Sequence, residues 1–112
     1  EFPEFWVDWS WHLDEEKSAM MRAESAYSIL ARAKRAVGAV MEENAADATV
    51  AIVSHTMPIK LLMADAVGIP LENMRQVKVD NCGVCEIELH KGEQSKLITW
   101  NERGFLMRKG LI

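Results

Sequence analysis

Two stretches of the chain repeat apolar residues at spacings of three and four. The first runs from Ser25 to about Asn44, and its apolar positions are Ile29, Leu30, Ala33, Val37, Val40 and Met41. This spacing predicts an amphipathic helix with a solvated opposite face. In the second stretch Thr56 is a candidate N-cap, Pro58 suits a first turn and Gly68 is a stop signal. The predicted buried stripe of that helix comprises Ile59, Leu62, Met63 and Ala66.

Three shorter apolar runs predict strands. Residues 49–53 are almost continuously apolar, as in a parallel strand buried on both faces. Residues 84–89 and 96–100 flank a polar, glycine-containing loop at 90–94, which fits a hairpin. Alternation along the first of these strands predicts one buried side, formed by Cys85, Ile87 and Leu89. The order helix, strand, helix, hairpin indicates a single α/β domain over residues 1–112.

Composition and charge exclude several classes of protein. The chain has 112 residues, 49% of them hydrophobic, and a formal net charge of −4, which suits one small folded domain. No basic stripe is present to neutralise a phosphate backbone, so neither nucleic acid nor an anionic membrane surface is an expected partner. No apolar run reaches the roughly 18 residues of a membrane span, and the first residues lack signal-peptide character. We expect a cytoplasmic protein.

Aromatic residues concentrate near the start of the chain, where Trp6, Trp9 and Trp11 fall within six positions. Such density is typical of packing, although a surface that contacts a partner would give the same pattern. Stacking on nucleic-acid bases is disfavoured because no basic residues lie beside the tryptophans.

The pair Cys82 and Cys85 forms a CxxC pattern, which serves redox and zinc sites in some proteins. Here a strand rather than a helix follows, and two further zinc ligands are not evident. We therefore interpret the cysteines as reduced, buried small hydrophobes and predict neither a metal nor a cofactor.

His55 lies where the predicted buried strand ends and the next helix begins. Open α/β sheets place ligands at this edge, and the N–H groups and dipole of a helix start attract anions. An imidazole there can donate a hydrogen bond to a phosphate. The alternative is a histidine that only caps the strand end. Lys60 and Arg75 could add positive charge near a phosphate, or be ordinary surface residues.

The segment Thr49-Val-Ala-Ile-Val-Ser-His55-Thr-Met-Pro-Ile-Lys60, continuing to Gly68-Ile-Pro70, resembles the second-histidine segment of the histidine phosphatase superfamily, the phosphoglycerate mutase-like proteins. Arg22-Ala-Glu-Ser25 is similar to the Gly-Glu-Ser segment of that family, and residues 79–84 and 97–101 are similar to its later strands. The similarity covers roughly residues 3 to 106. It implies the C-terminal part of a three-layer α/β/α fold with a mixed sheet.

The resemblance also implies roles for individual residues. His55, with the backbone of Thr56, would bind the transferring phosphoryl group as fixed donors do. Glu24 would protonate the leaving oxygen, which requires a carboxyl group with a pKa raised by burial. A solvated carboxylate near a helix N-terminus is the alternative for Glu24. Two departures from the family are Ala23 in place of glycine and Thr56-Met57 in place of Gly-Gly, which makes the backbone beside His55 bulkier.

The nucleophilic Arg-His-Gly segment of that family does not occur in these residues. His12 follows a tryptophan and His90 lies in the hairpin loop, so neither replaces it by motif. We therefore expect a phosphomonoester phosphatase or mutase domain that is inactive or incomplete alone, with a small phosphorylated substrate or free phosphate as ligand. The alternative is a non-catalytic half-domain acting as an interaction module. In either case an uncovered sheet edge would favour a homo-oligomer or a partner chain.

Overall fold

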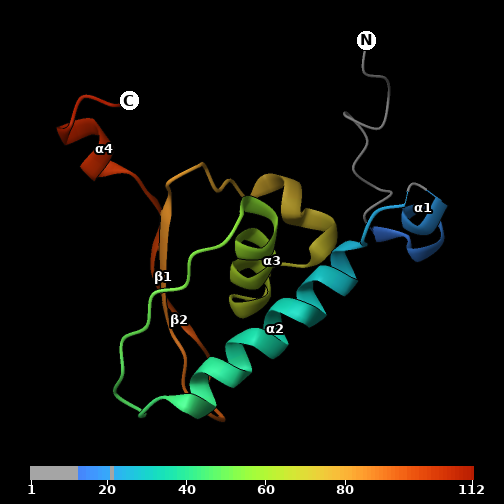
Figure 1. Ribbon diagram of the computed structural model, residues 1–112, viewed down its shortest axis with the longest axis horizontal. Coiled ribbons are helices and arrows are strands. Elements are labelled where there is room, and N and C mark those ends of the chain that lie inside the picture. The colour runs from blue at the N-terminus through green and yellow to red at the C-terminus, as the bar shows by residue number, and fades with distance from the viewer. Residues whose placement is uncertain (1–12, 21) are drawn as a thin grey trace.

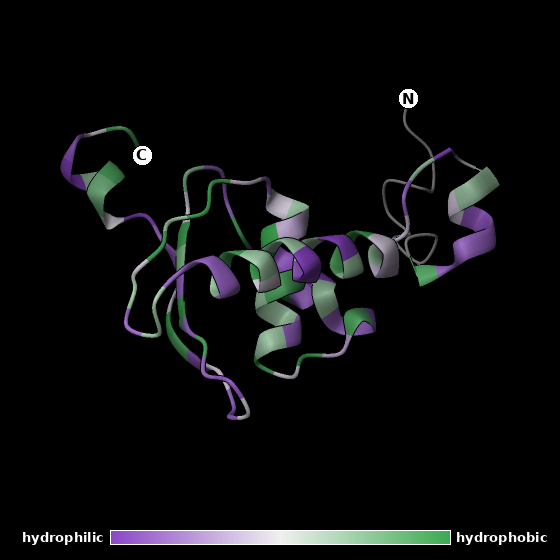
Figure 2. Cartoon of the chain, turned by 60° about the horizontal axis from the view of Figure 1, so that its bottom comes forward, coloured by the Kyte–Doolittle hydropathy of each residue, from purple (hydrophilic) through white to green (hydrophobic). Residues whose placement is uncertain are grey.

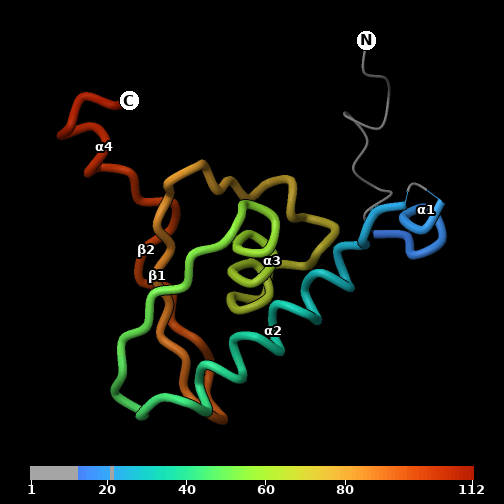
Figure 3. The backbone as a smooth tube through the Cα atoms, viewed as in Figure 1, coloured from blue at the N-terminus to red at the C-terminus, as the bar shows by residue number. Residues whose placement is uncertain are grey.

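The computed structural model describes residues 13–20 and 22–112, so the tryptophan cluster and His12 lie outside the described residues. The elements along the chain are α1 (Glu15–Met20), α2 (Ala26–Glu43), α3 (Thr56–Ala66), the 3-10 helix η3 (Leu71–Gln76), β1 (Val84–Glu88), β2 (Lys96–Glu102) and α4 (Gly104–Arg108). The molecule measures 45 × 39 × 21 Å (Figure 1). The short helices α1 and α4 lie at opposite ends of it, and α2 and α3 lie between them (Figure 3).

The long helix predicted after Ser25 is confirmed as α2. Ser25 is its N-cap, and the hydroxyl of Ser25 accepts a hydrogen bond from the Ser28 N–H at 3.2 Å. The same hydroxyl donates to Glu15 at 2.6 Å, which ties α1 to the start of α2. At the other end the Asn44 side-chain amide donates to the Val40 carbonyl at 2.7 Å and satisfies one of the last free carbonyls.

The helix predicted after residue 55 is confirmed as α3, with two corrections. His55, not Thr56, is the N-cap residue, and Thr56 is the first residue of the helix. The predicted buried stripe was wrong in part, because the buried residues are Leu61, Met63 and Ala64. Since α2, η3 and β1 all contact α3, more than one face of the helix is covered. Beyond the helix, Gly68 has a φ of +79°, the left-handed conformation that favours glycine after a helix.

The predicted hairpin is confirmed as the antiparallel pair β1 and β2, with a register irregularity within β1. Of the side predicted to be buried, Cys85 and Ile87 are half-buried, while Leu89 is exposed. Among the described residues these two strands form the whole sheet. The α/β class is therefore borne out at a coarse level.

The predicted buried strand at residues 49–53 was wrong: the segment is extended but pairs with no strand in the described part of the chain. Its side chains are exposed rather than buried, with Val50 at 45%, Ile52 at 53% and Val53 at 97% exposure. Figure 2 shows this apolar stretch as it crosses from α2 to α3. An extended segment becomes a strand only through hydrogen bonds to a neighbour, and no described strand provides them.

The core lies where α2, α3 and η3 meet, and its buried members are Ala26, Leu61 and Met74. Partly buried apolar residues surround them, namely Leu13, Ile29, Leu30, Met57 and Leu71. This cluster fixes the start of α3 against the start of α2, which are the two places that carry the predicted site residues. No helix in the described ranges combines the length and the hydropathy needed to cross a membrane.

Candidate functional site

The start of α3 presents His55 and Thr56 to solvent. His55 has an extended backbone with φ −114° and ψ 166°, and its carbonyl accepts the first helical hydrogen bond from the Ile59 N–H at 3.2 Å. No side chain caps the helix. The first N–H groups of a helix have no partner within it, and they carry the positive end of the dipole. The histidine and these N–H groups therefore form an exposed arrangement that attracts anions.

His55 does not cap a strand end, because residues 49–53 form no strand. The imidazole makes no hydrogen bond or ion pair to any residue that the structure describes. It is therefore accessible to a ligand from solution.

Glu24 lies at the start of α2 and is paired with Arg32. The guanidinium binds it through two hydrogen bonds, Nε to Oε2 at 3.2 Å and NH2 to Oε1 at 2.9 Å. The Ser28 hydroxyl donates a third, at 2.9 Å to Oε2. These bonds, that from Arg32 above all, lower the pKa of the Glu24 carboxyl. The raised pKa expected for a proton donor is thus wrong here, and the solvated carboxylate at a helix start describes what the structure shows.

The structure does not join the two predicted catalytic residues by any bond. All three hydrogen bonds of Glu24 go to residues of α2, and none reaches His55. What positions both residues is the packing of α2 against α3 around the core.

A hollow of about 300 Å³ lies beside the first turns of α3, lined by Met57, Lys60, Met74 and Arg75. Lys60 is half-buried, and this burial lowers the pKa of its amino group. The sequence left open whether Lys60 and Arg75 supply charge near a phosphate. The structure brings both to one hollow between α3 and η3.

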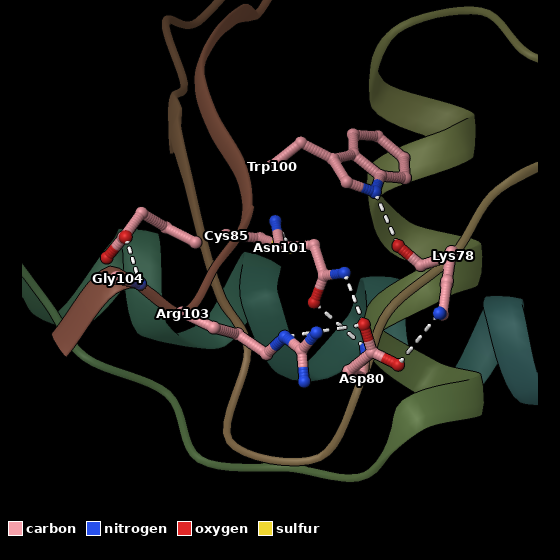
Figure 4. A network of polar contacts seen from close by, with 8 residues as sticks. Lys78, Asp80, Cys85, Trp100, Asn101, Arg103 and Gly104 are labelled. Atoms are coloured by element: carbon pink, nitrogen blue, oxygen red, sulfur yellow. Dashed lines mark hydrogen bonds and ion pairs between the residues drawn. The ribbon is translucent and has the colours of Figure 1, made fainter. Parts of the chain in front are cut away.

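Sequence reasoning missed a polar network that fastens the segment before β1 to the end of β2 (Figure 4). The Asn101 amide donates to the Asp80 carboxylate at 2.8 Å and accepts the Asp80 N–H at 2.9 Å. Arg103 and Lys78 form ion pairs with the same carboxylate at 3.4 and 3.5 Å. The bond from Asn101, and the nearby cations, lower the pKa of Asp80. The sequence offered little signal for it: Asn101 directly follows a predicted strand, and Asp80 lies four residues before another.

The two cysteines belong to this region, and the expectation that both are buried is wrong for Cys82, which is exposed, while Cys85 is half-buried. Cys85 accepts the Asn101 N–H through its sulfur at 3.4 Å, while Cys82 is exposed with a φ of +64°. Both are free thiols. Within the ranges that the structure covers, no three histidine, cysteine or acidic side chains come together as metal ligands.

An exposed histidine and the first N–H groups of a helix, in an α/β domain, form an arrangement that suits an anion. The family profile described as the histidine phosphatase superfamily (branch 1) matches residues 1–103. The chain belongs to this superfamily. No curated protein and no solved structure shows a significant match to it. The resemblance expected from the sequence is confirmed, and membership supports a phosphatase or mutase-like domain.

Proposed function

We propose that the chain contributes the second-histidine half of a phosphoryl-transfer site that acts on phosphomonoesters through a phosphohistidine. The observation that carries the proposal is the exposed His55 at the uncapped start of α3, in a chain that matches the superfamily over residues 1–103. In this proposal the complete domain has the three-layer α/β/α architecture.

His55 would donate a hydrogen bond to a phosphoryl oxygen, and the N–H groups of Thr56 and Met57 would stabilise the negative charge that develops on it. Pro58 has no N–H, so it offers the oxygen no donor. The nucleophilic histidine would come from an Arg-His-Gly segment outside these residues. The chain alone is then a phosphate-binding module with little turnover, because loss of the nucleophile removes most of the rate.

Glu24 would act as the proton donor to the leaving oxygen. In the structure this carboxylate is held ionised by Arg32, so the role requires the pair to open when the site is completed. Removal of the guanidinium and exclusion of water would both raise the pKa of Glu24 toward that of a proton donor at neutral pH.

The proposal is tested by calorimetric titration of the chain with orthovanadate, a mimic of the phosphoryl group. We expect the His55→Gln variant to bind at least about tenfold more weakly, which corresponds to the loss of a charge-assisted hydrogen bond. The matched control is His90→Gln, because His90 lies in the hairpin loop, paired with Glu88 at 3.5 Å. Equal affinities for the chain and His55→Gln would reject the proposal, as would an absence of binding.

The exposed residues 50–53 favour a second candidate function, assembly with another copy of this chain. Apolar β-branched side chains on an unpaired extended segment are typical of strands that add to a neighbouring sheet. Light scattering after gel filtration would give the mass. We expect Val53→Asp to reduce an oligomer to a monomer, while Met107→Asp, an equal charge on exposed α4, leaves it intact. A monomeric chain, or an oligomer that survives Val53→Asp, would exclude assembly through this segment.

A further inference from the structure

The extended segment that joins α2 to α3 offers an open edge of backbone (Figure 1). Every residue from Glu42 to Thr56 is exposed, and the apolar centre of the segment runs from Thr49 to Val53. In the ranges that the structure describes, residues 49–54 make no backbone hydrogen bond. This run contains neither a proline nor a charged side chain, which are features that protect an edge from pairing. Its backbone groups and its β-branched side chains are therefore available to a partner.

The charges on either side of this run have opposite signs. Asp47 lies four residues before Ala51, and His55, which is positive when protonated, lies four residues after it. Glu42 and Lys60 repeat the pattern at nine residues before and nine after. A segment that is acidic at one end and basic at the other attracts an antiparallel copy of itself and repels a parallel one. The segment is thus complementary in charge to a second copy of this chain.

Two-fold symmetry limits how two such segments can pair. When the axis is perpendicular to the paired backbones, opposite residues point to the same face, so their numbers must sum to an even number. With the axis at Ala51, Val50 lies opposite Ile52 and Thr49 lies opposite Val53. Each of these opposed pairs then consists of β-branched side chains, which favour pairing of extended backbones.

A register shifted by one residue loses these pairs. With the axis at residue 50, Val53 lies opposite Asp47, which sets an apolar side chain against a charge. With the axis at residue 52, Val50 lies opposite Ser54. The register about Ala51 is therefore the one that the pattern of side chains favours.

We propose that two copies of the chain pair antiparallel through residues 49–53 about a two-fold axis at Ala51, with Asp47 of each copy contacting His55 of the other. This inference rests on the second candidate function, assembly through this segment, and adds the orientation and register of the second copy. Opposite residues of an antiparallel pair have Cα atoms about 5 Å apart, which brings the carboxylate within reach of the imidazole. An imidazole has two nitrogens, so His55 meets this carboxylate with one and a phosphoryl oxygen with the other.

Disulfide trapping tests the register. In a Cys82→Ser background, which removes the exposed native thiol, Ala51→Cys is oxidised with copper phenanthroline and separated on a non-reducing gel. We expect a covalent dimer, because Cα atoms about 5 Å apart are within the range of a disulfide. The matched control is Val53→Cys in the same background. In this register its two copies are offset by four residues, roughly 14 Å, so the control should run as a monomer.

Sedimentation equilibrium tests the contact between the copies. At pH 5.5, where histidine side chains carry a proton, Asp47→Asn should raise the dissociation constant of the dimer about fivefold, because each dimer loses two exposed ion pairs. Glu93→Gln removes the same charge from the exposed hairpin loop and should leave the constant unchanged.

The outcomes separate the arrangement from assembly itself. If the chain is monomeric, both are overturned. If Val53→Asp abolishes an oligomer but Ala51→Cys gives no more covalent dimer than Val53→Cys, assembly through the segment stands and the two-fold register is rejected. If the register is confirmed but Asp47→Asn has no more effect than Glu93→Gln, the contact between Asp47 and His55 is rejected.

Discussion

Truncation of Leu61 should destabilise the fold more than any other single change to a side chain of α3. Leu61 has no exposed surface, and it is the largest fully buried side chain among the residues described. It packs with Ala26 and Met74, so it joins α3 to α2 and to η3. Leu61→Ala removes three carbon atoms, worth roughly 2.4 kcal/mol at about 0.8 kcal/mol each. The cavity left behind raises the expected loss of unfolding free energy to about 3 kcal/mol.

Urea unfolding followed by far-ultraviolet circular dichroism measures this loss. The matched control is Leu111→Ala, because Leu111 is 69% exposed near the C-terminus and its truncation should cost less than about 0.5 kcal/mol. If Leu61→Ala costs less than about 1 kcal/mol, or no more than the control, the core does not lie where α2, α3 and η3 meet. The placement of the His55 site by that core would then be wrong as well.

Three further predictions concern the polar contacts. A Cβ on Gly83 would overlap the Asn101 amide oxygen and lie 3.0 Å from the Asp80 carbonyl, so Gly83→Ala should lower the urea midpoint. The double variant Gly83→Ala/Asn101→Gly should lose less stability than the sum of the losses in the two single variants, because the clash is removed. Losses that simply add would contradict the contact. Arg32→Met should raise the pKa of Glu24, measured by carboxyl-carbon NMR titration; an unchanged pKa would show that the pair does not form in solution. Because the pKa of Asp80 is lowered in the folded state, its contribution is present above about pH 4 and lost as the pH falls further. Asn101→Gly has already lost this contribution at neutral pH, so its free energy of unfolding should fall less between pH 7 and pH 3 than that of the unchanged chain. Acid unfolding monitored by circular dichroism measures the two profiles, and equal losses in both chains would reject this role.

Local signals in the sequence predicted the helices and the hairpin. Ser25 and Gly68 are strong helix boundaries because each acts within a few residues, through a cap and a left-handed turn. The hairpin at residues 84–102 is likewise local, since its two strands pair with each other. The fold class followed from these elements, as far as the described structure tests it.

The strand expected at residues 49–53 was wrong because a strand depends on a partner distant in sequence, which the apolar pattern does not reveal. Its apolar pattern indicates what the segment can do and not whether a neighbour is present. The expectation of a raised pKa for Glu24 was wrong for a related reason. The sequence places Arg32 eight residues later but does not say that the guanidinium turns back onto the carboxylate.

His55 was predicted to lie where a helix begins, and the structure places it at the N-cap of α3, where it is exposed. The network around Asp80 escaped prediction because its bonds span 21 residues and depend on the left-handed φ of 55° at Asn101. The half-burial of Lys60 could not be predicted because residues of η3 lie beside it, and the apolar periodicity does not reveal η3.

The most direct test of the central claim is an NMR titration of the chain with inorganic phosphate, following the imidazole resonances of His55 and His90 and the backbone amides of α3. The account predicts saturable shifts of the His55 imidazole and of the Thr56 and Met57 amides, with His90 unchanged. Shifts that grow equally at both histidines without saturating, or saturable shifts that leave the start of α3 unaffected, would contradict it.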